Sequence, residues 1–355
     1  MPRLTRLNLR GFRCFESLEY EPGPRLSFIT GPNARGKTSV LEAACMLLRL
    51  RSPRTSNNSE MVRFGGNAFA LEGMVQASSA ETRLSLTCTP PARSLKLDGV
   101  PQSATADYLT QGRIVWFGSD DLLLVNGPAE RRRKLLDAAG LQLAGISTTY
   151  ARDLKDYDRA LRSRNLLLRE GKPRNQIEAY DIPLSEAGDR LIASRRELVT
   201  SLAPLAAEAC AMISCESLEL SYIPGAGLPM GEALAASRGE EIRLRQTRVG
   251  PQRDDVGVML GGIPAGSFAS EGQRRTVALA IKLAVAALLT RENGSSPLLL
   301  LDDIFGELDP LRRDALLAGM PTGSQALLTT ADLGGISLPE GSVVHRVESG
   351  CLVEG

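Results

Sequence analysis

Two segments that lie far apart in the sequence constrain the fold more than any other feature. Residues 31–38 read Gly-Pro-Asn-Ala-Arg-Gly-Lys-Thr, which matches the pattern GxxxxGK(S/T). Residues 298–301 are four consecutive leucines, and Asp302 and Asp303 follow them. A loop of the first kind wraps phosphate groups with its backbone N–H groups, and an unbroken apolar run is typical of a parallel strand buried on both faces. The pair therefore predicts an α/β fold with a parallel sheet that binds a nucleoside triphosphate.

The phosphate-binding segment has the local context that such a loop requires. A short apolar strand at residues 26–30 leads into it, and apolar residues at helical spacing predict a helix over residues 38–50. Lys37 is expected to reach the β- and γ-phosphates, and the Thr38 hydroxyl is expected to ligate Mg²⁺. We assign nucleotide contacts to the whole segment, which comprises Gly31, Pro32, Asn33, Ala34, Arg35, Gly36, Lys37, Thr38 and Ser39.

The two aspartates stand at the C-terminal end of the predicted apolar strand. Asp302 is placed to hold Mg²⁺, directly or through water, and Asp303 is placed to orient the attacking water. An aspartate at a strand end is often only a helix cap. Because the phosphate-binding loop is also present, we favour the catalytic interpretation and predict Lys37, Asp302 and Asp303 as the catalytic residues and Thr38 and Asp302 as the metal ligands.

A third segment, Ser270-Glu271-Gly272-Gln273, opens a long predicted helix. Ser270 is a good N-cap, and the positive end of a helix offers free N–H groups to an anion. In isolation, a plain capped helix is the better interpretation of this tetrapeptide. Its position changes the interpretation, because it precedes the acidic strand and the loop Gly306-Glu307-Leu308-Asp309 in the order that is typical of ABC-type ATPases.

The pattern of the chain changes twice along its length. Strand patterns, including an Asp98-Gly99 hairpin signal, give way to long helical stretches between about residues 126 and 215, and strand signals return after Gly250. We expect residues 1–120 and 241–355 to form two halves of an ATPase lobe and residues 121–240 to form an inserted helical lobe. Leucines spaced seven apart at 154, 161 and 168 make too short a heptad for an extended coiled coil and indicate core packing.

Composition excludes several classes of protein. No apolar run approaches the roughly 20 residues of a membrane helix, and the N-terminal residues lack the apolar centre of a signal peptide. The six cysteines form no CxxC pair, and His345 is the only histidine, so a zinc site is not expected. These features predict a cytoplasmic protein with reduced thiols.

The motifs together resemble the ABC-type heads of DNA-repair proteins and, among these, the RecF family of bacterial recombination mediators. The resemblance rests on residues 9–13, 31–38, 126–133, 164–165, 250–255, 270–282 and 298–309, which cover nearly the whole chain in the right order. It implies an ABC-type P-loop ATPase head with an inserted helical second lobe and no long coiled coil. It also implies a homodimer that forms on ATP, in which Ser270, Gly272 and Gln273 of one subunit contact the γ-phosphate held by Lys37 of the other, and Asp309 contacts across the dimer.

The same resemblance implies partners and a biological role. RecF-like proteins bind DNA at single-strand gaps without sequence preference, cooperate with RecO and RecR, help RecA to load, and hydrolyse ATP slowly. We therefore expect a weak, DNA-stimulated ATPase that acts as a switch and takes part in DNA repair. ATP and Mg²⁺ are the expected cofactors.

Three features depart from the usual pattern. Ala34 stands where the family usually has glycine, and Thr329-Thr330 stands where transporter ATPases have a histidine that contacts the γ-phosphate. The usual Q-loop glutamine has no counterpart, because Ser119-Asp120-Asp121 follows the relevant strand. The missing histidine fits a slow, switch-like ATPase.

A basic segment is the candidate DNA surface. Residues 131–174 contain 12 Lys or Arg and 5 Asp or Glu in a chain of net charge +1. Arg131, Arg132, Arg133 and Lys134 begin a predicted helix, where positive charge opposes the helix dipole and DNA phosphate would compensate. Pairing with acidic groups of the chain itself explains them equally well, and both interpretations stay open. The same holds for residues 253–255, which suit either a nucleotide site or a turn.

Two rival functions belong to other ABC-type assemblies. A transporter-type subunit would carry a Q-loop glutamine, the histidine and a Leu-Ser-Gly-Gly-Gln signature, and this sequence has none of them. A nuclease-coupled ATPase would need an acidic metal cluster in a further C-terminal domain. The roughly 50 residues after Asp303 are expected to be too few for one.

Overall fold

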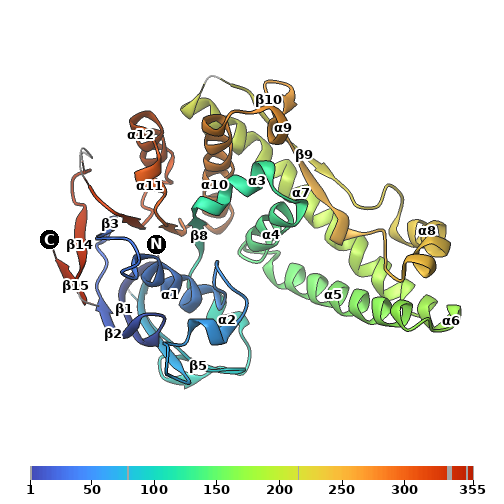
Figure 1. Ribbon diagram of the computed structural model, residues 1–355, viewed down its shortest axis with the longest axis horizontal. Helices are drawn as coiled ribbons and strands as arrows, with labels where there is room; N and C mark the ends of the chain where they lie inside the picture. Colours follow the sequence, from blue (N-terminus) through green and yellow to red (C-terminus); the bar gives the residue numbers. More distant parts are fainter. Residues whose placement is uncertain (1, 78–79, 215, 334–337, 349–350, 355) are drawn as a thin grey trace. The chain divides into compact units, whose positions relative to one another are not determined.

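The computed structural model describes residues 2–77, 80–214, 216–333, 338–348 and 351–354, which group by their contacts into two units (Figure 1). The first unit comprises residues 1–121 and 285–355, and the second comprises residues 122–284. Helix α10 (Glu271–Asn293) begins in the second unit and ends in the first. The expected boundaries near residues 120 and 240 stay a prediction.

A mostly parallel sheet forms one layer of the first unit. Its strand order is β15-β14-β3-β13-β12-β8, and only the pairing of β15 with β14 is antiparallel. The predicted leucine strand is β12, and all four of its residues are buried between β8 and β13. The strands are β3 (Leu26–Thr30), β8 (Ile114–Phe117), β12 (Leu298–Leu301), β13 (Ala326–Thr330), β14 (Val343–Glu348) and β15 (Cys351–Glu354).

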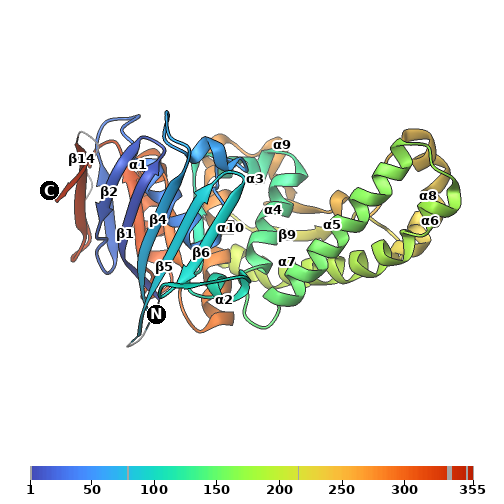
Figure 2. The same ribbon diagram turned by 90° about the horizontal axis from the view of Figure 1, so that it is seen from below.

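An antiparallel sheet forms a second layer of the same unit, and Figure 2 shows its strands side by side. The order is β2-β1-β4-β5-β6-β7, and the predicted Asp98-Gly99 hairpin joins the last two strands, with both residues at positive φ. Helix α1 (Lys37–Arg49) contacts strands of both sheets and supplies apolar side chains to the core between them. The strands are β1 (Arg3–Phe12), β2 (Phe15–Tyr20), β4 (Phe69–Ala77), β5 (Ala80–Thr89), β6 (Ala92–Leu97) and β7 (Val100–Pro101).

Short helices complete the first unit. They lie in the connections between strands, where the chain changes direction. They are η1 (Asn58–Met61), α2 (Ala106–Leu109), η2 (Ser119–Leu122), α11 (Ile304–Glu307) and α12 (Pro310–Gly319), and η2 runs one residue into the second unit.

The second unit is mainly helical, as the sequence predicts for residues 126–215, and it also contains a small sheet of order β11-β10-β9. The long helices α5 and α7 pack against each other. Its elements are α3 (Leu123–Asn126), α4 (Ala129–Gly140), α5 (Ser147–Arg169), α6 (Arg174–Glu178), α7 (Asp181–Ile213), β9 (Leu218–Ile223), α8 (Met230–Leu244), η3 (Pro251–Arg253), β10 (Asp255–Leu260), β11 (Ile263–Pro264) and α9 (Ala265–Phe268).

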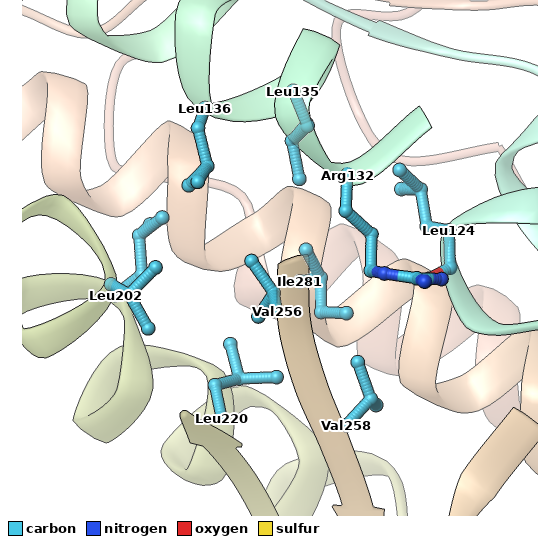
Figure 3. A pocket seen from close by; sticks show the side chains of 10 residues that line it. Leu124, Arg132, Leu135, Leu136, Leu202, Leu220, Val256, Val258 and Ile281 are labelled. Atoms are coloured by element: carbon cyan, nitrogen blue, oxygen red, sulfur yellow. The ribbon is translucent and has the colours of Figure 1, made fainter. Parts of the chain in front are cut away.

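The core of the second unit contains a small apolar cavity of about 20 Å³ (Figure 3). Aliphatic side chains such as Leu136, Leu202 and Val256 line it, together with the side chain of Arg132. A volume of this size holds about one water molecule, and the lining offers it no set of polar partners. The cavity is therefore a packing gap rather than a ligand site.

Among the residues that the structure describes, no helix is both long enough and apolar enough to span a membrane.

Candidate functional site

The backbone of the phosphate-binding loop passes through the left-handed region at three positions. Gly31 (φ 137°), Ala34 (φ 64°) and Gly36 (φ 99°) all have positive φ. A Cβ atom at Gly36 would lie 2.6 Å from the Cys14 sulfur and 2.7 Å from the Phe15 ring, so this position requires glycine on steric grounds as well. Ala34 adopts the conformation that a glycine would adopt more easily, and an alanine there costs about 1 kcal/mol.

Lys37 is the first residue of α1, and its side chain folds back over the loop. It is 3% exposed, and its Nζ donates hydrogen bonds to the carbonyl oxygen of Gly31 at 2.8 Å and to that of Pro32 at 3.2 Å. The third donor points to Asn33 Oδ1 at 3.3 Å. Residues 32–35 are exposed, so the loop presents its backbone to solvent while its lysine lies beneath it.

The structure brings the two halves of the predicted site together at Thr38 and Asp302. The Thr38 hydroxyl donates to Asp302 Oδ1 at 2.7 Å across 264 residues of sequence. This follows from the sheet order, because β3 and β12 flank β13 and their carboxyl ends meet at one edge. Burial raises the pKa of Asp302, and the hydroxyl groups of Thr38 and Thr329 oppose that shift by hydrogen bonding to the carboxylate.

These residues fit the Mg²⁺ ion that the sequence predicts. One hydroxyl and one carboxylate oxygen lie 2.7 Å apart, and both are oxygen ligands of the kind that Mg²⁺ prefers. Within the described part of the chain, no group of three or more His, Cys, Asp or Glu side chains could hold a metal. That composition suits an ion held by one or two protein oxygens together with substrate phosphates.

Asp303 begins the turn that follows β12. Its φ is 54°, in the left-handed region, and its backbone N–H donates to Thr329 Oγ1 at 2.8 Å. The sequence predicts Asp303 as the residue that orients water, and the structure places it one residue beyond Asp302 at the same strand end. The sequence pattern indicates only that Thr329 stands where transporter ATPases have a histidine, and it does not predict this contact.

The Ser270 segment forms a reciprocal cap at the start of α10. Ser270 Oγ accepts from the Gln273 backbone N–H at 3.3 Å, and Gln273 Oε1 accepts from the Ser270 N–H at 2.7 Å. This is the capping box, in which a serine and a residue three positions later satisfy each other. The Gln273 amide also donates to Glu216, which precedes β9. Ser270 is exposed and Gly272 is half-buried, so the predicted partner-facing residues lie at the surface of the second unit.

Asp309 is the N-cap of α12, and its carboxylate accepts from the Arg312 N–H at 3.0 Å. The Arg312 side chain also pairs with it. The backbone N–H of Arg312 holds the pKa of Asp309 below its usual value. The side chain is 44% exposed, which leaves it accessible for the contact across a dimer that the resemblance implies.

The basic residues of α4 differ in their surroundings. The Arg132 guanidinium donates to Asp255 at 2.6 and 3.0 Å, and Arg133 donates to the carbonyl oxygen of Asp254 at 2.7 Å. The Lys134 side chain is 67% exposed and pairs with Glu130 one turn away. Arg132 and Arg133 therefore bind groups of the chain itself, which was one of the two interpretations of the basic segment. That the α4 residues bind DNA stays a prediction.

A buried polar network explains several motifs that the sequence left unassigned. Arg195 donates to Asp137, to Asp254 and to the carbonyl oxygen of Pro251, each at 2.8 Å, and Asp254 is fully buried. The segment at residues 250–255 therefore makes structural contacts inside the second unit, through Pro251 and Asp254. Arg195 carried no signal in the sequence, because its partners lie about 60 residues away on either side.

A second buried group joins α5, α7 and α8. Arg164 is fully buried and donates to Asp181 at 2.8 Å and to the Thr247 hydroxyl at 2.9 Å. It also pairs with Glu241 at 2.8 Å. The Arg164-Asn165 motif is thus part of the internal structure of the second unit, since Asn165 accepts from the Thr247 N–H as well.

Comparison with known proteins gives consistent matches. The family model described as "RecF/RecN/SMC N terminal domain" matches residues 3–334. The DNA replication and repair protein RecF of Symbiobacterium thermophilum is 38% identical and aligns with 97% of this chain and 95% of its own. The protein of the same name from Lactococcus lactis strain MG1363 is 32% identical and aligns with 99% of this chain and 98% of its own.

Solved structures give the same match. The recombination mediator protein RecF–ATP in the RecFOR pathway has a TM-score of 0.90 at 28% identity, over 100% of this chain and 98% of that chain. A Pyrococcus furiosus Smc head domain has a TM-score of 0.59 at 16% identity, over 100% of this chain and 96% of that chain, and shares the fold. The predicted fold class, an ABC-type head in an α/β chain, is confirmed by these neighbours.

Proposed function

The chain belongs to the RecF family, and on this premise we propose that it is an ATP-dependent DNA-binding protein of recombinational repair. The observation that carries the proposal is the contact between Thr38 and Asp302, which joins the phosphate-binding loop to the acidic strand. Solved relatives described as RecF–ATP support ATP as the nucleotide. The relatives named DNA replication and repair proteins support the biological role.

The proposed ATP site uses residues of the first unit. Lys37 exchanges its bonds to the loop carbonyl groups for bonds to the β- and γ-phosphates, and the backbone N–H groups of residues 31–39 surround the phosphates. Thr38 and Asp302 would hold Mg²⁺, which would supply positive charge to neutralise the phosphates and polarise the γ-phosphoryl group. Asp303 orients the attacking water from the turn after β12.

We propose that ATP joins two copies of the chain head to tail. Ser270, Gly272 and Gln273 lie at the exposed N-terminal end of α10, where N–H groups and the helix dipole attract an anion. They would contact the γ-phosphate held by Lys37 of the second copy, and Asp309 would contact across the same interface. In this proposal the ATPase is slow and DNA-stimulated, and hydrolysis times the release of the dimer. The dimer acts at gapped DNA together with RecO and RecR and helps to load RecA.

The split site is tested with Ser270→Arg, which places a long cation where the partner's γ-phosphate would approach. We expect light scattering to show wild-type dimers only with ATPγS, and to show monomers of the variant under all conditions. At protein concentrations too low for dimers to form, binding of ATPγS to the variant should stay within about threefold of wild type, because the variant alters only the half of the site that the second copy contributes.

Ser103→Arg is the matched control, since Ser103 is exposed in the first unit and lies outside every motif. It should dimerise as wild type does. If the Ser270 variant dimerises normally with ATPγS, the proposal of a shared nucleotide site is wrong. If wild type binds no ATPγS, the proposed function itself is wrong.

A further inference from the structure

Thr329 lies beside the acidic pair because of the register of the parallel sheet. Strand β13 runs between β3 and β12, and Leu328 pairs with Leu301 at the end of β12. The next residue of β13 therefore stands next to Asp302. Thr329 is fully buried, so its hydroxyl has only protein groups as partners.

The Thr329 hydroxyl uses both its donor and its acceptor capacity on the two aspartates. It donates to Asp302 Oδ1 at 3.0 Å and accepts from the Asp303 backbone N–H at 2.8 Å. A longer approach of 3.5 Å to the Leu301 carbonyl oxygen is the weaker alternative for its single hydrogen. The hydroxyl thus fixes the carboxylate of one aspartate and the backbone of the next.

We propose that Thr329 is a positioning residue for ATP hydrolysis, which holds Asp302 and the turn at Asp303 in the geometry that the reaction needs. This inference rests on the proposed ATPase function. Asp302 Oδ1 also accepts from Thr38, but that hydroxyl is the one assigned to the metal. The contact with Thr329 comes from β13, the strand directly adjacent to β12, so it persists when Thr38 turns to the ion.

The bond to the Asp303 N–H has a second role. Asp303 has a positive φ of 54°, a conformation that is uncommon outside glycine although aspartate tolerates it better than most residues. The hydroxyl of Thr329 is the buried acceptor that satisfies this N–H group. Without the Thr329 hydroxyl, the turn loses the contact that fixes the Asp303 backbone and with it the direction of the Asp303 side chain. The orientation of the attacking water is then impaired together with the metal site.

The neighbouring threonine supplies a matched control. Thr330 is also buried, at 2% exposure, and also ends β13. Its hydroxyl donates to the carbonyl oxygen of Asp332 at 2.8 Å rather than to the acidic pair. Thr329→Val and Thr330→Val therefore remove one hydroxyl each from the same strand end, and only the first removes a contact with the aspartates.

The experiment measures steady-state ATP hydrolysis and nucleotide binding for wild type, Thr329→Val, Thr329→Ser and Thr330→Val. We expect Thr329→Val to lower kcat about 10- to 100-fold with KM for ATP within about threefold, because residues that orient metal ligands have effects of this size. Thr329→Ser, which keeps the hydroxyl, should recover most of kcat. Thr330→Val should stay near wild type.

A second readout does not depend on turnover. Binding of a fluorescent ATP analogue is measured in EDTA and in Mg²⁺. Thr329→Val should match wild type in EDTA and lose about tenfold or more of the gain in affinity that Mg²⁺ gives. Equal unfolding temperatures of the two valine variants would show that the difference is local.

Three results would overturn the inference. The first is a Thr329→Val variant with the kcat and the Mg²⁺ dependence of wild type. The second is an equal loss of kcat in Thr329→Val and Thr330→Val. The third is a Thr329→Ser variant whose kcat is as low as that of Thr329→Val. In each case wild type still hydrolyses ATP, so the proposed function stands. If wild type neither binds nor hydrolyses ATP, the proposed function fails and this inference fails with it.

Discussion

At the scale of single residues, Arg195 joins more segments of the second unit than its sequence context indicates. Its guanidinium is 4% exposed and bridges α4, α7 and the segment before β10. Burial alone would lower the pKa of Arg195, but the carboxylates of Asp137 and Asp254 outweigh it and raise the pKa above the usual range. The Arg195 guanidinium therefore keeps its charge although it is buried.

Replacing Arg195 should destabilise the second unit strongly. Arg195→Ala leaves the carboxylate of Asp254, which is fully buried, without its compensating charge. Breaking a buried pair in this way costs about 3–5 kcal/mol, which urea unfolding followed by circular dichroism measures. Arg196→Ala is the control, because Arg196 is exposed and lies over the Tyr222 ring at 5.8 Å, a contact worth about 0.5–1 kcal/mol. If Arg195→Ala and Arg196→Ala lower the free energy of unfolding equally, the buried network does not stabilise the second unit as predicted.

Which residue contacts could be predicted depends on how far apart the two residues lie in the sequence. The nucleotide loop was identified because residues 31–38 carry their chemistry within eight positions. For Arg132, the sequence left DNA binding and internal pairing equally open, because its partner Asp255 lies 123 residues further along the chain. Thr329 was noticed only as a position that lacks histidine, since its contact with Asp302 depends on strand order.

At the scale of elements, the ends of helices were better predicted than their buried faces. Ser270 was predicted as an N-cap and caps α10, because capping depends on residues three positions apart. In α5, the leucine heptad predicted as core is only partly buried at Leu154 and Leu161. Tyr150, Tyr157 and Arg164 are buried instead, because polar partners on α4, α7 and α8 and in the segment before β10 satisfy their side chains.

The cap of α12 should depend on pH in a defined direction. The folded-state pKa of Asp309 is depressed, so the stability it contributes is present above the unfolded pKa of about 3.9 and is lost as the pH falls through the folded value. At pH 7, Asp309→Ala should cost α12 about 1 kcal/mol, measured by hydrogen exchange of its amides.

Asp309→Asn keeps an acceptor oxygen at the cap but cannot ionise. Its protection of α12 should therefore stay nearly constant between pH 3 and pH 7, whereas wild type should lose protection towards the acidic end. If wild type and Asp309→Asn lose protection in parallel, the ionised carboxylate does not stabilise the helix.

At the scale of the whole molecule, the net charge of +1 requires that any DNA contact be local. Arg132 and Arg133 are held by the Asp255 carboxylate and the Asp254 carbonyl oxygen, whereas the Lys134 side chain is 67% exposed, so Lys134 and its neighbour Arg131 are the α4 residues to test. Changing both to Gln should reduce the slope of log K against log salt by about 1–2 for gapped DNA, because each phosphate contact contributes about 0.9. Fluorescence anisotropy over a salt series measures the slope.

Lys155→Gln with Arg159→Gln is the matched control, because both residues are exposed on α5 within the same basic segment. Their slope should equal that of wild type. If only the α5 pair lowers the slope, the DNA surface lies on α5 and the prediction for α4 is wrong.

The fold class was predictable because an ABC-type head places its motifs in a fixed order along the chain, and the family match confirms it. The small sheet β11-β10-β9 was not predicted, since its strands lie on both sides of α8 and each is short. Residues 218–222 alternate apolar and polar side chains as a strand does, but the strand they pair with, at residues 255–260, lies beyond α8.

The position of β3 in its sheet has a consequence for biosynthesis. The neighbours of β3 are β13 and β14, and Thr38 meets Asp302 only across 264 residues. A chain emerging from the ribosome makes the phosphate-binding loop early, but the strands on both sides of β3 are translated only after the second unit. The second unit, which is continuous from residue 122 to 284, can fold in the meantime. The proposed nucleotide site is thus completed long after its phosphate-binding loop is made, and only in chains that have already passed the second unit.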